Sequence, residues 1–262
     1  MMVMQGSPRP TGRGEKLYEG KAKMFYATED PQLVIQYFKD DATAFYAQKR
    51  GTIIDKGVCN NRIASRMFQV LEAAGVPTHF VKQLSDREML VKRLQIVPLE
   101  VTIRNITAGG MAKMLGIEEG IVLKRPVFEW HYKSDALGDP LINDDHILAL
   151  ELATTEELET IRRWSFRVND VLRAYFAQRG IDLVDFKLEF GRFPALSSQG
   201  NDPEPKARDR HASQILLGDE ISPDTCRFWE QGTKKKLDKD RFRRDLGDVE
   251  AAYQEILRRV LQ

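Results

Sequence analysis

The sequence is poor in the residues that cross-link small proteins or bind soft metals. Its 262 residues include two cysteines, Cys59 and Cys226, and four histidines that stand singly. Two cysteines cannot form a disulfide framework or a multi-cysteine zinc site. A chain of this length buries roughly 70–75% of its unfolded surface, so it needs no such staple to fold. Both classes of small, cross-linked protein are excluded.

Long hydrophobic runs and a strong net charge are also absent. No window approaches the roughly 18 uninterrupted apolar residues that a membrane span needs, and residues 1–15 lack the apolar segment of a secretory signal. We interpret residues 1–15 as a flexible tail. Forty Lys and Arg balance 39 Asp and Glu, so the net charge of +1 gives no argument for nucleic acid as a partner. We expect a cytoplasmic protein without a membrane or nucleic-acid partner.

The first third of the chain is predicted to be rich in strands. The expected strands are residues 16–27 (broken at Gly20), 33–38, 79–84, 88–94 and 99–106. Between them, apolar residues at helical spacing predict a helix over 63–74, which Gly75 and Pro77 end. This part of the sequence is typical of a β-rich lobe.

The second half mixes helices and strands. The expected elements are a short helix at 110–115, a long helix at 155–179 with a capping box from Thr154 and Glu157, a strand at 181–192 and a C-terminal helix over 249–260. Residues 193–214 are polar, rich in Pro and Gly, and without a period, which predicts a mobile loop. We therefore expect an α+β fold, with a β-rich N-terminal lobe over 16–98 and a mixed α/β C-terminal lobe over 99–262.

The strand after Gly180 carries an unusual charge pattern. Alternation places Val184, Phe186, Leu188 and Phe190 on an apolar face, and Asp185, Lys187 and Glu189 on the other face, about 6–7 Å apart. An acid, a base and an acid on one face could hold a metal ion and an anionic substrate together. Taken alone, the pattern favours a solvated strand face whose charges neutralise one another.

A second acidic pair follows the long loop. Three apolar residues, 215–217, precede Gly218, Asp219 and Glu220, as expected for a strand that ends at a Mg²⁺ site. If residues 193–214 are a loop, the two strands form a hairpin that brings Glu189 near Asp219. An acidic, solvated turn is the alternative, and for this motif alone it is the better one.

Other residues are suited to anions. Lys21 and Lys23, beside Gly20, could clamp a polyphosphate, or could be solvated lysines on a hairpin. The segment from Arg104 to the amides of 109–110 at a helix start would suit a phosphate or carboxylate. Arg227 could add a bidentate fork, with a surface ion pair as the alternative. The sequence has no Walker A loop and no G-x-G-x-x-G motif.

In this order, the motifs resemble the SAICAR synthetase (phosphoribosylaminoimidazole-succinocarboxamide synthase) family of purine biosynthesis. The resemblance covers nearly everything from Lys16 to the C-terminus. It is carried by KLYEGKAK (16–23), DKG (55–57) with Asn60 and Asn61, VPLEV (97–101), Arg104-Asn105, Lys133 with DALGDP (135–140), LVDFKLEFG (183–191), GDEISPD (218–224) and DKDRFR (238–243). Each motif is weak alone, but together and in register they are very specific.

The resemblance implies an ATP-dependent ligase. Such an enzyme joins L-aspartate to the carboxylate of carboxyaminoimidazole ribonucleotide through an acyl phosphate, and releases ADP and phosphate. The implied fold is a kinase-like or ATP-grasp-like arrangement of two lobes with ATP in the cleft. The implied partners are small molecules (ATP, the ribonucleotide and L-aspartate) with Mg²⁺, and a homodimer is possible.

The resemblance also implies roles for individual residues. Those expected to bind ATP are Lys21, Lys23, Lys92, Glu100, Glu189 and Asp219, and Glu189 and Asp219 are also the expected Mg²⁺ ligands. Lys187 and Asp185 are the expected catalytic residues. Arg104, Gly110, Lys133, Asp139 and Arg227 are expected to bind substrate. The chain departs from the family in having Gly110 where serine is usual, and in the length of 193–214.

Two other functions remain open at this stage. A small-molecule kinase on a similar scaffold would consume ATP without aspartate. A non-catalytic regulator would bind ATP without turnover, which the retained Lys187, Glu189 and Asp219 argue against. Release of ADP with each substrate omitted in turn separates all three.

Overall fold

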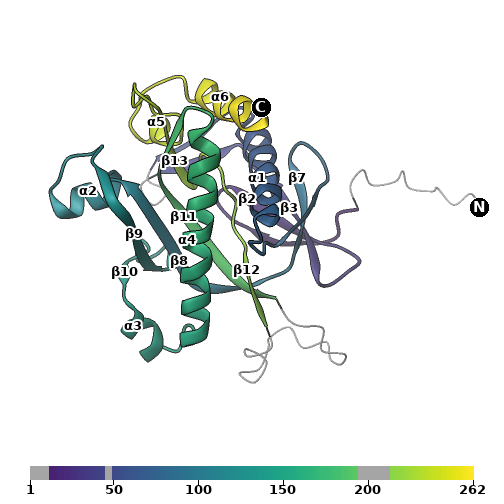
Figure 1. Ribbon diagram of the computed structural model, residues 1–262. Helices are drawn as coiled ribbons and strands as arrows, with labels where there is room; N and C mark the ends of the chain where they lie inside the picture. The colour runs from purple at the N-terminus through teal and green to yellow at the C-terminus, as the bar shows by residue number, and fades with distance from the viewer. Residues whose placement is uncertain (1–11, 45–48, 194–212) are drawn as a thin grey trace, which may run out of the picture.

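The computed structural model describes residues 12–44, 49–193 and 213–262. Within this part of the chain, two large antiparallel sheets and a small β-ribbon are flanked by helices (Figure 1). Helices and strands are not arranged as repeating β-α-β units, so the fold is α+β, as the sequence predicts. No helix in the described ranges is long and apolar enough to cross a membrane.

The N-terminal sheet contains five strands in the order β1-β2-β3-β7-β6. They are β1 (Lys16–Glu19), β2 (Lys23–Ala27), β3 (Leu33–Phe38), β6 (Phe80–Gln83) and β7 (Glu88–Lys92). A separate ribbon pairs β4 (Asp41–Ala44) with β5 (Lys49–Thr52). Helix α1 (Lys56–Ala73) packs on this sheet and starts seven residues before the predicted helix. Its first two turns bury polar side chains, Lys56, Asn60 and Asn61, which an apolar stripe does not reveal.

The second sheet has the order β10-β9-β8-β11-β12, and β13 also pairs with β11. Its strands are β8 (Gln95–Ile106), β9 (Val122–Tyr132), β10 (Leu141–Ile142), β11 (Ile181–Phe193), β12 (Gln214–Leu217) and β13 (Cys226–Glu230). Strands β9, β10 and β13 were not predicted from the sequence. In β9, the run Lys124, Arg125 and Pro126 near the start of the strand interrupts an alternating pattern, which explains why it was missed.

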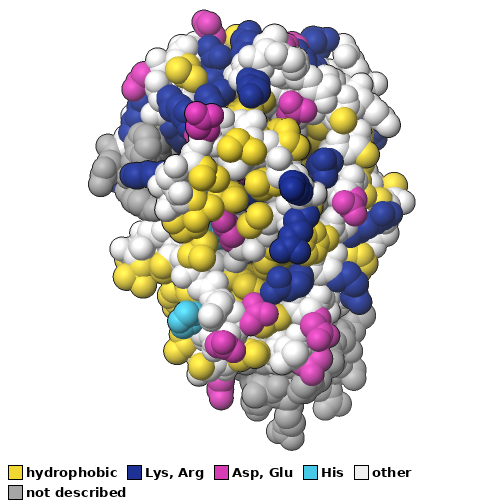
Figure 2. Space-filling view, turned by 60° about the vertical axis from the view of Figure 1, so that its left-hand side comes forward, with side chains coloured by type: hydrophobic (Ala, Val, Ile, Leu, Met, Phe, Trp, Pro, Cys, Tyr) yellow, Lys and Arg dark blue, Asp and Glu magenta, His cyan; other side chains and the backbone are white. Residues whose placement is uncertain are grey.

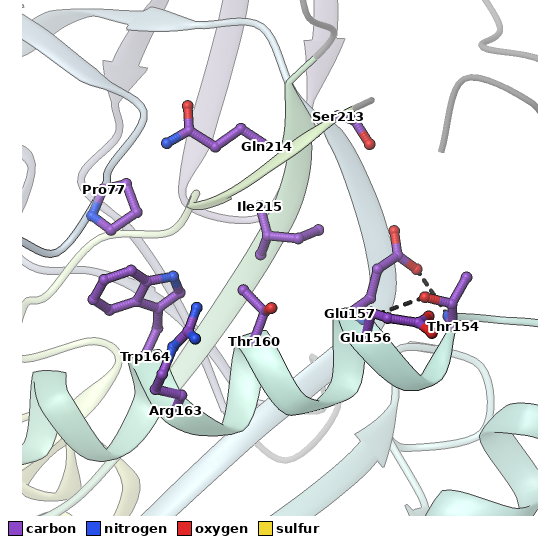
Figure 3. A pocket seen from close by; sticks show the side chains of 10 residues that line it. All are labelled: Pro77, Thr154, Glu156, Glu157, Thr160, Arg163, Trp164, Ser213, Gln214 and Ile215. Atoms are coloured by element: carbon purple, nitrogen blue, oxygen red, sulfur yellow. Dashed lines mark hydrogen bonds between the residues drawn. The ribbon is translucent and has the colours of Figure 1, made fainter. Parts of the chain in front are cut away.

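The helices of the second half cover this sheet and join it to α1. The predicted long helix is α4 (Thr155–Ala177), and its capping box is present: Glu157 N–H donates to Thr154 Oγ1 at 3.2 Å, and Thr154 N–H donates to Glu157 Oε2 at 2.9 Å (Figure 3). The other helices are α2 (Gly109–Leu115), α3 (Asp144–Ala149), α5 (Asp240–Arg243) and α6 (Val249–Leu261). Of these, α2 and α6 were predicted and α3 and α5 were not.

One hydrophobic core runs through both halves of the chain. Phe38 and Met67 belong to the same buried cluster as Leu188, Phe228 and Tyr253. The two sheets divide between Lys92 and Gln95, so the expected boundary between residues 98 and 99 lies inside β8. The division into two lobes stays a prediction.

The expected tail and loop lie mostly outside the described residues, at 1–11 and 194–212. The last residues of the expected tail are held, because Gly14 N–H donates to Ala27 O at 2.8 Å and the Arg13 guanidinium lies 4.7 Å from each of the Tyr26 and Tyr37 ring centres. The flexible tail over 1–15 stays a prediction. The hairpin around the loop is confirmed, since β11 ends at Phe193 and pairs with β12 from Gln214.

Strand β11 lies at the centre of its sheet and contains a bulge. Its pairing with β13 shifts register between Leu183 and Asp185. Leu183 thereby joins Phe186, Leu188 and Phe190 in the main core, whereas Val184 packs with Ile106, Ala108 and Trp229 in a separate cluster. The prediction that Val184 shares the face of Phe186 is wrong, because a bulge breaks strict alternation.

Candidate active site

The charged face of β11 joins two groups of side chains. We call the first the lysine–carboxylate cluster; it consists of Lys23, Lys133, Glu189, Asp219 and Glu220. We call the second the arginine pocket; it is the cavity of about 290 Å³ beside Arg104, Asp185 and Arg227. Glu189 belongs to the cluster and Asp185 to the pocket, with Lys187 between them on the strand.

The lysine–carboxylate cluster gathers residues from four strands or the residues that follow them. Lys23, at the start of β2, contacts the carboxylates of Asp219 and Glu220, which follow β12. Lys133, just after β9, contacts the carboxylate of Glu189 on β11. The hairpin holds its two acidic positions together, because Gly218 N–H donates to Glu189 O at 2.9 Å. The predicted approach of Glu189 and Asp219 is confirmed.

The acids of this cluster differ in their pKa values. Burial and the neighbouring charge of Asp219 together raise the pKa of Glu220 to about 8, against the opposing effect of Lys23. Burial and Asp219 also raise the pKa of Glu189. Burial would raise the pKa of Asp219 too, but Lys23 outweighs it and holds this pKa below its usual range. Three carboxylates share two ammonium groups, so the cluster has room for additional positive charge.

The donor set of the cluster fits Mg²⁺ bound together with a ligand. Within the described ranges, no group of three or more His, Cys, Asp or Glu side chains is arranged to hold a metal by itself. Mg²⁺ usually binds proteins through one or two carboxylates and takes its other ligands from substrate phosphates and water. Glu189 and Asp219 supply that number of carboxylates.

The arginine pocket is held by buried carboxylates. Arg104 on β8 donates to Asp185 Oδ2 at 2.8 Å, and Arg227 on β13 donates to both Asp185 oxygens at 3.0 and 2.8 Å. On their other sides, Arg104 donates to Glu129 Oε2 at 2.9 Å and Arg227 to Asp240 Oδ2 at 3.0 Å. Each guanidinium is thus fixed between two carboxylates from different elements.

Six residues predicted to act in catalysis or substrate binding line this one cavity. They are Arg104, Gly110, Asp139, Asp185, Lys187 and Arg227. Lys187 also contacts the carboxylate of Glu100 on the neighbouring strand β8. The predicted catalytic and substrate-binding residues therefore converge, except for Lys133, which lies in the cluster.

The chain matches a family model described as SAICAR synthetase over residues 16–260. It belongs to the SAICAR synthetase family. A phosphoribosylaminoimidazole-succinocarboxamide synthase from Clostridium acetobutylicum is 56% identical over 246 residues, which cover 94% of this chain and 97% of that protein. The fold is similar to the crystal structure of a synthase of the same name from Ehrlichia chaffeensis, with a TM-score of 0.86, 45% identity and coverage of 94% and 98%. It is also similar to a SAICAR synthetase (type 2) in complex with ADP, with a TM-score of 0.83, 42% identity and coverage of 93% and 96%.

The two glycines at the start of α2 differ in what they tolerate. Gly109 has φ +52°, and a Cβ there would collide with the Arg227 guanidinium. Gly110 lies outside the left-handed region, and a Cβ there would meet only Arg104 Nη2, at 3.9 Å. Gly109 N–H donates to the carboxylate of Glu119 at 2.8 Å, so this amide already binds an anionic group of the chain itself, and its expected contact with a substrate anion stays a prediction.

Three residues expected to bind ATP lie outside both groups, and one of them, Glu100, contacts Lys187. Lys21 pairs with Asp135 at 2.6 Å on the surface. Lys92 donates to Thr78 O at 3.5 Å, and its ammonium lies 5.7 Å from the centre of the Phe193 ring. Burial, together with the charges of Lys23 and Lys92, lowers the pKa of His79 to about 3. Lys92 therefore lies on the His79 side of the cluster.

The sequence analysis missed Glu220, Glu129 and Asp240 as members of the site. Glu220 stands in the same acidic pair as Asp219, so that pair was itself a usable signal. Glu129 lies on β9, a strand that was not predicted, and Asp240 lies in DKDRFR, a motif already singled out. Glu129 and Asp240 contact Arg104 and Arg227 because β9 pairs with β8 and β13 pairs with β11.

A second cavity, of about 410 Å³, lies between α4 and β12. Its lining includes Pro77, Thr160, Trp164, Gln214 and Ile215 (Figure 3). None of the residues predicted to act in catalysis or binding lines it. We assign it no part in the reaction.

Proposed function

We propose that this chain carries out its family's reaction along the charged face of β11, with phosphoryl transfer at the lysine–carboxylate cluster and the ribonucleotide in the arginine pocket. The family joins L-aspartate to the carboxylate of carboxyaminoimidazole ribonucleotide at the expense of ATP. The observation that carries the proposal is the continuity of the two groups through Asp185, Lys187 and Glu189 on one strand.

The chemistry explains why these charges are needed. An oxygen of the substrate carboxylate attacks the γ-phosphorus of ATP, the bond to the β-phosphate oxygen breaks, and ADP leaves. The resulting acyl phosphate is a good acylating agent, which a carboxylate is not. The aspartate amine then attacks the acyl carbon, phosphate leaves, and the amine nitrogen loses a proton. Phosphoryl transfer of this kind depends on positioned charge rather than on a protein nucleophile.

The lysines of the cluster can supply that charge. Lys23 and Lys133 lie against carboxylates, and an ammonium on a flexible stem can turn to phosphate oxygens when a nucleotide binds. Lys187, between the two groups, is placed to neutralise charge on the transferred phosphoryl group. Glu189 and Asp219 would hold Mg²⁺. The ion would offset the charge of the phosphate oxygens.

The arginine pocket suits the phosphate of the ribonucleotide. Arg104 and Arg227 present planar forks that match a phosphate or a carboxylate. Asp185 accepts from both arginines, so its contacts support a role in fixing them. The catalytic role expected for Asp185 stays a prediction, as do the substrate contacts expected for Gly110 and Asp139.

The test is ADP release assayed with each substrate omitted in turn. We expect release that requires ATP, the ribonucleotide and L-aspartate together under steady turnover. Release that persists without aspartate and without the ribonucleotide would favour a small-molecule kinase. Nucleotide binding without any release would favour a regulator.

The expected homodimer stays a prediction. Figure 2 shows hydrophobic side chains gathered on the face that contains α2 and the start of β9. The exposed apolar residues of this segment are Met114, Leu115, Ile117, Ile121 and Val122. Light scattering across a concentration series measures whether the chain is a dimer. A loss of dimer on changing Val122, 70% exposed, to Lys would assign this face.

A further inference from the structure

A charged group is buried behind the active site, between α1, α6 and the turn that precedes β13. Lys56, the first residue of α1, is 0% exposed, and its ammonium donates to Asp224 Oδ2 at 2.7 Å. The hydroxyl of Tyr253 on α6, also 0% exposed, donates to Asp224 Oδ1 at 2.6 Å. The two oxygens of one carboxylate are therefore held from two different helices.

Stability alone does not account for this arrangement. Lys239 Nζ lies 3.9 Å from Asp224 Oδ1, so two ammonium groups face a single buried carboxylate. Taking such charges out of water is costly, and apolar side chains of similar volume often serve stability as well or better. Helices α1 and α6 already share apolar packing, since Ile63 and Ile256 belong to the same core cluster. A buried ionic contact is not needed to join them.

The direction of Lys56 is set by the start of α1. A Cβ at Gly57 would collide with the carbonyl of Phe38 and with the Arg87 side chain, so the helix begins pressed against the end of β3. Gly57 N–H also donates to Asp40 Oδ1 at 2.9 Å. Lys56 therefore reaches Asp224 from a rigid base.

The turn that contains Asp224 connects to both groups of the active site. Thr225 Oγ1 donates to the carbonyl of Glu220 at 2.8 Å, which ties the turn to the lysine–carboxylate cluster. Lys187 N–H donates to the carbonyl of Thr225 at 2.9 Å, which ties it to β11. Asp224 is also one of the residues that line the arginine pocket. A displacement of this turn would move Glu220 and the backbone of Lys187 relative to each other.

We propose that Lys56 and Tyr253 are positioning residues for phosphoryl transfer: by holding Asp224 they fix residues 222–225 and thereby the placement of Glu220, Asp219 and Lys187. Neither residue acts on the substrate directly. The inference rests on the proposed function for its kinetic consequence, but the placement of the turn can be measured independently.

The test compares two variants that each lose one hydroxyl beside α6. Tyr253→Phe removes the bond to Asp224. Tyr175→Phe removes a bond of similar length, from Tyr175 Oη to Val260 O at 2.7 Å, which ties the same helix to α4 away from the site. We expect Tyr253→Phe to lower kcat roughly tenfold with a small change in the KM for each substrate, because a small misplacement of reacting groups is costly. Tyr175→Phe should retain kcat at a similar Tm.

Equal kcat values in the two variants, or loss of kcat in both in proportion to Tm, would overturn the inference. Lys56→Met provides a second route through the same carboxylate. Combined with Tyr253→Phe, it should lower kcat by less than the product of the single effects, since both act through Asp224. A multiplicative loss would show that the two residues act independently.

Hydrogen exchange separates this inference from the proposed function. Peptides that cover 218–226 should exchange faster in Tyr253→Phe than in Tyr175→Phe. A wild-type chain that releases no ADP would overturn the proposed function, and exchange would then decide whether the turn is held as we infer. Unchanged exchange and unchanged kcat in Tyr253→Phe would refute it.

Discussion

The two halves of the active site are built from the same charges but in different ways. In the arginine pocket, each guanidinium is bound by two buried carboxylates, and Arg227 meets Asp185 through two short contacts. In the lysine–carboxylate cluster, three acids compete for two ammonium groups on long, flexible stems. The pocket is fixed before substrate arrives, whereas the cluster gains favourable partners only when ligand enters. The difference suits a nucleotide that arrives and leaves in every turnover.

The largest expected effect lies in the cluster. Glu189→Gln or Asp219→Asn should lower turnover by about 100-fold or more, because each removes a charge from the site of phosphoryl transfer with little change in volume. The Tm of Glu189→Gln should stay near that of the wild type, because burial and Asp219 raise the pKa of Glu189 and its charge is therefore not stabilising. Asp219→Asn should lower the Tm, because Lys23 holds the pKa of Asp219 below its usual range.

Activity of both variants is measured at limiting Mg²⁺, with Asp245→Asn as a control because Asp245 is 85% exposed and far along the chain from the cluster. Near-normal turnover in both cluster variants would mean that the metal is placed wrongly.

The same chemical change in the arginine pocket should act on stability. Asp185 is 3% exposed and neutralises two guanidinium groups, so Asp185→Asn leaves two buried positive charges without their shared partner. Removing one member of a buried ion pair costs about 3–5 kcal/mol. Urea unfolding should show a loss of this order, with a higher KM for the ribonucleotide. A variant as stable as Glu189→Gln would erase the contrast between the two halves.

The pH dependence of stability should reveal the crowded acids of the cluster. Burial and Asp219 raise the pKa of Glu220 from 4.5 to about 8. The folded state therefore retains a proton that the unfolded state loses, and this contribution to stability falls as the pH rises from about 4.5 to 8. Glu220→Gln cannot lose that proton, so its Tm relative to the wild type should rise by several degrees from pH 5 to pH 8.

Glu255→Gln is the matched control for that experiment. The hydrogen bond from Arg258 is the main cause that lowers the pKa of Glu255, to about 2, so this group stays ionised throughout the range. Its Tm difference from the wild type should be flat between pH 5 and pH 8. A flat profile for Glu220→Gln as well would contradict the crowding of charge in the cluster.

The smallest effects are expected at the glycines beside the pocket. Gly110→Ser should bind the ribonucleotide as well as the wild type or several-fold better, since a hydroxyl donor is worth about 0.5–1.5 kcal/mol net. Gly110→Ala should bring no gain. Gly109→Ala should raise the KM and lower the Tm, because of the positive φ and the collision with Arg227. If Gly109→Ala leaves the KM and the Tm unchanged, Arg227 is less rigidly held than its contacts with two carboxylates indicate.

Local patterns predicted the parts of the site that are contiguous in the sequence. The charged face of β11 and the hairpin with Asp219 follow from alternation and from the composition of the loop, and α4 follows from its period and capping box. The contacts between distant segments did not follow. From its sequence context Lys56 is expected at the surface, but it is completely buried in the fold. Val184 fits the alternating pattern of its strand, but a bulge places its side chain in a different cluster from that of Phe186. Burial of a charge depends on what packs above it, which a local pattern does not contain.

The central position of β11 has a consequence for the order of folding. Its neighbours β8 and β13 lie about 80 residues before it and about 40 residues after it in the chain, as the pairs Asp185–Arg104 and Asp185–Arg227 show. Closing such long loops is slow, and local helices form first. A partly folded chain, with α1 and α4 already helical, still has no arginine pocket and no aligned acids. Substrate binding therefore selects fully folded chains, and ATP or the ribonucleotide at saturating concentration should protect the whole sheet from proteolysis.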